Sequence, residues 1–171
     1  MNMKNIVTSL DISTKLCDLG VKQESIWCWF PTDDLLDQDA PGYKLVNDGN
    51  NPIRKEFLES HNLISAFVVE ELFDILPFEF FRDETRKFMS YNEEIAQEKE
   101  FVIKHRYTLK LQKIPASHDY WYCWATGRAY DNFGLAVCET SFSEGDNSAA
   151  NAAAKMLIYL IENKLIELPE D

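Results

Sequence analysis

Residues 147–166 read NSAANAAAKMLIYLIENKLI, and their pattern predicts an amphipathic helix that closes a sheet. Asn147 or Ser148 is placed to cap the first exposed amides, and Asp146 favours the positive helix start. The apolar stripe recurs at three- and four-residue steps and consists of Ala150, Ala153, Ala154, Leu157 and Ile161. Small residues at the front allow close approach to a neighbouring element, and larger ones fill the gap further along.

This helix also has a second apolar face, formed by Met156, Tyr159 and Leu160, which lie off the main stripe. If that face stays open, a second copy of the chain can cover it. We therefore expect a homodimer contact through these three residues.

The preceding residues predict two more helices and several strands. A helix is expected over 10–19, capped at Ser9 and stopped by Gly20, and a shorter one over 68–76. Strands are expected over 26–30, 101–114, 120–128 and 133–142, whereas 78–96 has no clear period. The prediction is an α+β fold. An antiparallel β-meander of three to five strands is packed by an N-terminal helix, a short middle helix and a C-terminal helix.

We expect residues 1–171 to form a single α+β domain with a loop insertion at 31–62. That range contains the turn-rich segments PTDDLLDQDAPG and NDGNNP around a brief YKLV run, and one or two helical turns are expected over 53–60. The acidic part, counted from Asp37, partly matches the spacing of a calcium loop. Pro41 stands where an oxygen ligand belongs, so a solvated loop is the preferred interpretation.

Composition narrows the function classes. The 171 residues carry a formal net charge of −12, which argues against direct binding to nucleic-acid phosphates and against anionic membrane surfaces. The apolar run at 156–161 is too short to span a bilayer, and no signal peptide is evident, so a cytoplasmic protein is expected. None of the four cysteines (Cys17, Cys28, Cys123 and Cys138) belongs to a CxxC pair, and we expect them reduced.

Motifs for catalysis or cofactor binding are not evident. The sequence has no phosphate-binding glycine loop, no GxSxG nucleophile elbow and no helical pair of histidines for a metal. We interpret His61, His105 and His118 as surface or structural residues. No catalytic residue, cofactor or metal is therefore predicted.

The densest functional signal is aromatic. Trp27 and Trp29 share one strand face, and Tyr120, Tyr122 and Trp124 share another. Aromatic rows of this kind either pack in the core or form a surface for a partner or ligand, and the pattern leaves both open.

Two functions are consistent with these observations. The first is a non-catalytic protein-interaction module, one form of which is an acidic inhibitor that imitates nucleic acid. The alternative is a small-molecule binder or enzyme with a site between the sheet and the 31–62 loop. His61, His105 and Arg128 are the candidate residues of that site.

Three segments carry a family resemblance. They are NIVTSLDISTKLCDLGVKQESIWCW at 5–29, AFVVEELFDILP at 66–77 and NAAAKMLIYLIENKLI at 151–166. In order and spacing they resemble an uncharacterised family of small proteins from gut bacteria and their phages. The strand–strand–helix ending is also similar to a phage alpha-beta-alpha sandwich domain. The resemblance implies a mobile-element origin, a small α+β fold and a host or phage protein as partner, and it assigns no site residue.

Overall fold

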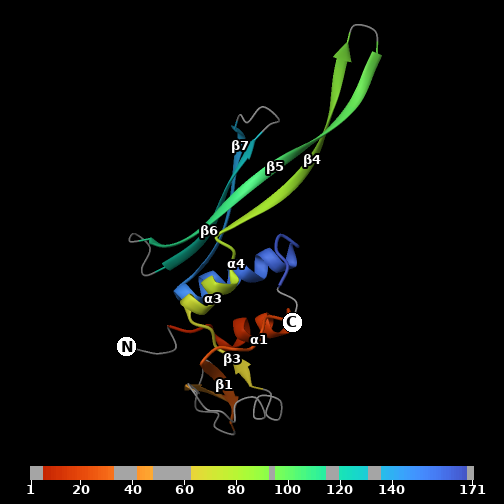
Figure 1. Ribbon diagram of the computed structural model, residues 1–171. Coiled ribbons are helices and arrows are strands. Elements are labelled where there is room, and N and C mark those ends of the chain that lie inside the picture. Colours follow the sequence, from red (N-terminus) through yellow and green to blue (C-terminus); the bar gives the residue numbers. More distant parts are fainter. Residues whose placement is uncertain are drawn as a thin grey trace.

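The computed structural model describes residues 6–32, 42–47, 63–92, 95–114, 120–130 and 136–168. Within these ranges the chain forms three helices and two antiparallel sheets, so the predicted α+β class is confirmed (Figure 1). The expected helical turns at 53–60, the acidic loop from Asp37 and the residues His61 and His118 lie outside the described ranges.

The larger sheet is the predicted meander. Its strands are β4 (Glu79–Asn92), β5 (Ile95–Ile114), β6 (Tyr120–Tyr130) and β7 (Ala136–Asp146). They lie in the order β4-β5-β6-β7, and each is antiparallel to its neighbour. Most of the stretch without a clear sequence period is therefore the first strand of this sheet.

A second, smaller sheet was not predicted. It consists of β1 (Trp27–Pro31), β2 (Tyr43–Asn47) and β3 (Ile64–Ser65), in the order β2-β1-β3. Within the range expected as a loop insertion, 31–62, Tyr43–Asn47 is a strand that pairs with β1 along its whole length. The physical reason is apolar packing, because Tyr43 and Leu45 pack against the buried cluster around Trp29.

The N-terminal helix α1 (Leu10–Asp18) ends as its sequence predicts. Gly20 has a φ of +83°, and the Val21 amide donates to the Leu16 carbonyl at 3.0 Å. The short helix α3 (Val69–Ile75) begins where the Glu71 carboxylate accepts a hydrogen bond from the Val68 amide at 3.0 Å. Both helices pack against the third helix, α4 (Ala149–Glu162).

Helix α4 is the centre of the molecule and lies between the larger sheet and the other two helices (Figure 1). Its fully buried residues are Ala150, Ala152, Ala153, Ala154, Met156, Leu157 and Leu160. The predicted dimer contact is therefore wrong: Met156 and Leu160 have no exposed surface, and the Tyr159 ring packs on Phe142 with the centroids 4.7 Å apart. The chain's own elements cover the second apolar face of α4.

The start of α4 is held by a polar cluster around Asp146. The Ser148 amide and the Asn151 side-chain amide donate to Asp146 Oδ1 at 3.0 and 3.2 Å. Lys155 Nζ donates to Asp146 Oδ2 at 2.8 Å. Burial raises the pKa of Asp146, but the hydrogen bonds and the Lys155 charge outweigh it, so this pKa lies below its usual value of 3.8. The predicted role of Asp146 at the helix start is confirmed.

We expect Asp146→Ala to lower the free energy of unfolding by about 2 kcal/mol near neutral pH, because three donors lose a half-buried acceptor. A carboxyl with a depressed folded-state pKa contributes stability above its unfolded pKa, and the contribution is lost as pH falls through the folded pKa. The difference in free energy of unfolding between the wild type and Asp146→Ala should therefore shrink below pH 4. Urea denaturation from pH 7 to pH 2 checks this.

The control for that prediction is Glu162→Gln, which breaks an exposed ion pair with Lys15 (2.6 Å). Exposed ion pairs contribute about 0–1 kcal/mol to stability, so the free energy of unfolding of this variant should stay close to that of the wild type from pH 7 to pH 2. Equal losses in the two variants would contradict the role assigned to Asp146.

Candidate functional site

The larger sheet has one covered face and one open face. Cys123 and Ala125 on β6 are fully buried, as expected for strand residues that face α4. The alternate residues form what we call the outer face, and most of those with described side chains are exposed. Its exposed members are Phe81, Arg106, Lys110, Gln112, Thr126, Arg128, Ser141 and Ser143.

An aromatic row runs along β6 on the outer face. The ring centroids of Tyr120 and Tyr122 are 5.0 Å apart, and those of Tyr122 and Trp124 are 5.7 Å apart. Each of the three side chains is partly exposed, and the buried Trp124 Nε1 has no hydrogen-bond partner among the described residues. The predicted grouping of these three aromatics is thus present, on a face that water reaches.

Small side chains on β7 flank this row. Gly145 pairs with Tyr122, and Ser143 pairs with Trp124. A Cβ added at Gly145 would lie 2.5 Å from Cε1 of Tyr120, so glycine lets the rings lie directly on the backbone. On the other side of the row, the register places Lys110 beside Trp124.

The other predicted pair, Trp27 and Trp29, is located elsewhere. Trp29 is 2% exposed, and its Nε1 donates to the Thr8 carbonyl at 3.2 Å. Trp27 packs partly against the same small-sheet cluster. Trp29 is therefore a core residue of the small sheet and has no surface for a partner, and neither tryptophan joins the row on β6.

Sequence reasoning missed three exposed phenylalanines: Phe73 on α3 is 37% exposed, and the other two lie near the start of β4. Phe78 is 74% exposed, and Phe81 on the outer face is 63% exposed. Next to Phe81, the Arg106 guanidinium makes a bidentate ion pair with Glu79 at 2.6–3.0 Å. Phe78 and Phe81 fall in the stretch whose period was unclear, so no alternation marked them.

The histidine and arginine candidates do not form one site. His105 is 1% exposed, lies on the covered face and stacks on Tyr107 with the ring centroids 6.0 Å apart. Arg128 is exposed on the outer face, where it pairs in register with Arg106. The sheet separates the two side chains, and His61 lies outside the described residues.

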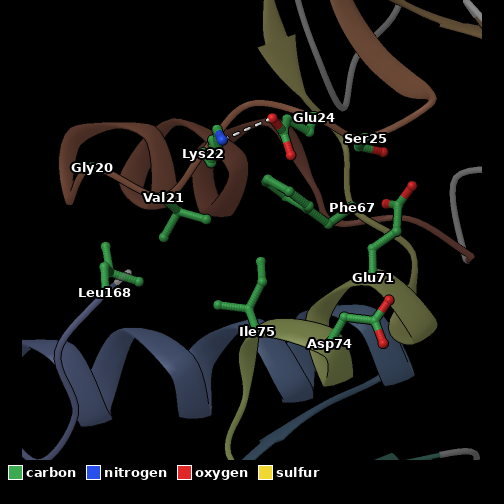
Figure 2. Close-up of a pocket in the computed structure, with 10 residues that line it drawn as sticks. All are labelled: Gly20, Val21, Lys22, Glu24, Ser25, Phe67, Glu71, Asp74, Ile75 and Leu168. Atoms are coloured by element: carbon green, nitrogen blue, oxygen red, sulfur yellow. Dashed lines mark ion pairs between the residues drawn. The ribbon is translucent and has the colours of Figure 1, made fainter. Parts of the chain in front are cut away.

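A cavity of about 620 Å³ lies where the ends of α1 and α3 meet the C-terminal segment (Figure 2). Part of its polar lining is already engaged, because Lys22 pairs with Glu24 at 3.2 Å and the two Glu71 oxygens accept the backbone amides of Ile26 and Val68. Figure 2 shows the apolar side chains of Val21, Phe67 and Ile75 between these groups. Glu24 and Glu71 are therefore bound to a neighbouring lysine and to the backbone, respectively.

Burial raises the pKa of two described thiols, Cys17 and Cys123. Cys17, Cys28 and Cys123 form no disulfide, and the side chain of Cys138 lies outside the described part. Burial raises the pKa of Cys123 to about 12, so at neutral pH it is a thiol and a poor nucleophile. Among the described residues no cluster of three or more His, Cys, Asp or Glu side chains is placed to hold a metal ion. None of the helices described is long and apolar enough to cross a membrane.

Comparison with known proteins gave no match: no family model fits the chain, and no curated protein and no solved structure is significantly similar to it.

Proposed function

We propose that the chain is a non-catalytic protein-interaction module that binds its partner through the aromatic row Tyr120, Tyr122 and Trp124. The observation that carries the proposal is the position of this row on the outer face, between the exposed Lys110 and the small residues of β7. Tyrosine and tryptophan contribute large contact areas at low cost in side-chain entropy, and they dominate binding energies at protein interfaces.

The surroundings of the row favour a protein partner. The flanking positions are small or polar, so an apolar side chain of a partner can reach the ring faces and exclude water around them. The family resemblance suggests a host or phage protein as this partner.

The test is affinity capture with the tagged chain from a lysate of the source cells, followed by binding measurements on the purified partner. We expect Tyr122→Ala and Trp124→Ala each to weaken binding roughly 30-fold, the effect of losing an interface anchor of about 2 kcal/mol. Isothermal titration calorimetry gives the dissociation constants, and circular dichroism checks that each variant is folded.

Trp121→Ala is the matched control, because Trp121 lies between Tyr120 and Tyr122 on the same strand but faces the other side of the sheet. There the centroid of its ring is 5.9 Å from Lys113 Nζ. Its affinity for the partner should equal that of the wild type. If the partner binds the Tyr122 and Trp124 variants as tightly as it binds the wild type, the aromatic row is not the binding surface.

The alternative, a small-molecule site, has weaker support. The geometry that favours it is the cavity at the ends of α1 and α3 rather than a site beside residues 31–62. A thermal-shift screen of metabolites on the wild type, repeated with Phe67→Ala, separates the two functions. A ligand that stabilises the wild type and not this variant would favour the alternative.

A further inference from the structure

Strand β4 is an edge of the larger sheet within the described residues, and its far half belongs to a two-stranded arm. Pairing of β5 with β6 begins at Lys104, whereas pairing of β4 with β5 continues to Asn92 and Ile95. The arm therefore contains the β4–β5 pairs from Glu84 to Asn92 on β4, about 30 Å of strand at 3.4 Å per residue. Figure 1 shows the arm projecting away from the helices.

A two-stranded ribbon of this length is marginally stable by itself in water. The outward N–H and C=O groups of β4 are a template for a further strand, and such a strand would give the arm the third member it lacks. The occupant that fits this edge can be inferred from the order of charges along β4.

The charges on β4 are arranged symmetrically around Thr85. Asp83 and Glu84 precede it, and Arg86 and Lys87 follow it. In antiparallel pairing of β4 with β4 of a second copy about a two-fold axis at Thr85, residues equally distant from Thr85 lie opposite one another. Asp83 then lies opposite Lys87 and Glu84 opposite Arg86, and each pair occurs twice by symmetry.

The two neighbouring registers, with the axis one residue to either side of Thr85, do not bring opposite charges together in this way. An axis at Glu84 places Arg82 opposite Arg86, which is repulsive, and an axis at Arg86 places Glu84 opposite Phe88. Charges on an edge strand often prevent pairing of edges. Here their order, acidic before Thr85 and basic after it, makes one antiparallel register attractive.

We propose that β4 pairs with β4 of a second copy of this chain, antiparallel and with the two-fold axis at Thr85. The two larger sheets then form one continuous sheet, and the arm of each copy lies beside the β4 edge of the other. This contact uses the sheet edge and leaves the outer face open, so it does not depend on the proposed partner binding.

The test is sedimentation equilibrium of the purified full chain and of charge variants on β4. Glu84 and Arg86 pair with the uncharged Ile103 and Phe101 on β5, so changing them places no like charges directly opposite one another across the β4–β5 pair. We expect the wild type to dimerise and Glu84→Lys or Arg86→Glu alone to weaken the dimer roughly tenfold or more, because each places like charges opposite twice.

Mixing the two single variants is the decisive measurement. In the mixture, the lysine that replaces Glu84 in one chain lies opposite the glutamate that replaces Arg86 in the other, and the two unchanged side chains at these positions form the second opposite-charge pair. The mixture should therefore form a heterodimer of wild-type affinity. The double variant Glu84→Lys with Arg86→Glu should again dimerise by itself.

Two variants control for net charge. Lys164→Glu and Glu24→Lys make the same changes in net charge at exposed positions away from β4, so they should dimerise like the wild type. A loss of association in these variants equal to that of the β4 variants would show that net charge, and not the register at Thr85, governs the dimer.

Three results would overturn the proposal. The first is a wild type that stays monomeric at the highest soluble concentration. The second is a pair of single variants that dimerise as tightly as the wild type. The third is a mixture that associates no better than its separate components. Circular dichroism of each variant confirms that lost association is not lost folding.

Discussion

Leu157→Ala is expected to lower the free energy of unfolding by about 3–5 kcal/mol, the largest effect of any substitution considered for this chain. Leu157 has no exposed surface and lies on α4, which packs against β5, β6, β7, α1 and α3. Because elements on both sides are tied to other parts of the chain, they cannot close a cavity at this position. The loss is a large share of the roughly 5–15 kcal/mol that stabilises a typical domain.

Urea denaturation followed by far-ultraviolet circular dichroism and by tryptophan fluorescence measures this loss. The two signals should have the same midpoint, because α4 packs on the larger sheet and on α1 and α3 and so joins them in one cooperative unit. Ile158→Ala is the control, because it removes the same number of carbon atoms from a partly exposed neighbour and should cost about 1–2 kcal/mol. Equal costs at the two positions would show that α4 is not held on both sides.

Gly127→Ala is expected to cost about 3 kcal/mol, a large effect for the addition of one methyl group. Gly127 lies on β6 opposite Tyr107, and an added Cβ would be 2.5 Å from two carbons of the Tyr107 ring. That ring cannot move aside easily. It is 4% exposed, stacks on Phe80 with the centroids 4.9 Å apart, and contacts Phe142 with the centroids 5.4 Å apart.

Two controls separate this clash from a general cost of replacing glycine. Gly145→Ala brings a Cβ equally close to the Tyr120 ring, but Tyr120 lies on the outer face, is partly exposed and can rotate, so the cost should stay below about 1 kcal/mol. In a Tyr107→Ala background, Gly127→Ala should cost almost nothing. A cost that persists without the Tyr107 ring would contradict the steric explanation.

Local signals in the sequence predicted the end of α1 and the start of α4, whereas the Ser9 side chain, expected to cap α1, donates to Asp11 and caps no backbone amide. Gly20 stops α1 through its left-handed backbone, and Ser148 caps α4 by accepting a hydrogen bond from the Asn151 amide at 3.4 Å. These motifs depend on backbone groups a few residues away, so a short window of sequence contains all that is needed. The alternation at Tyr107 and Leu109 can also be recognised within a short window of sequence. It is present because one face of β5 packs on α4 there and the other does not.

Features that depend on distant neighbours could not be predicted. Alternation marks a strand only where one face is buried, and β4 continues beyond the strands that α4 contacts. The two aromatic groups look alike in sequence, yet Trp29 is buried by Val7 and Ala66 while Trp124 lies on an open face. The second face of α4 was assigned to a dimer because nothing local shows that distant elements of the chain cover it, such as β7 with Phe142 against Tyr159.

The place of α4 along the chain has a consequence for synthesis on the ribosome. Every strand of both sheets is translated before α4, so the buried face of β6, including Cys123 and Ala125, has no cover until residue 162 has left the exit tunnel. Completion of the fold should therefore wait for synthesis of α4 rather than proceed strand by strand. Stalled nascent chains that end before α4 should be cut readily by protease, and resistance at that length would contradict this order of events. A growing chain of this protein would thus offer chaperones an apolar sheet surface in the interval between synthesis of β6 and emergence of α4.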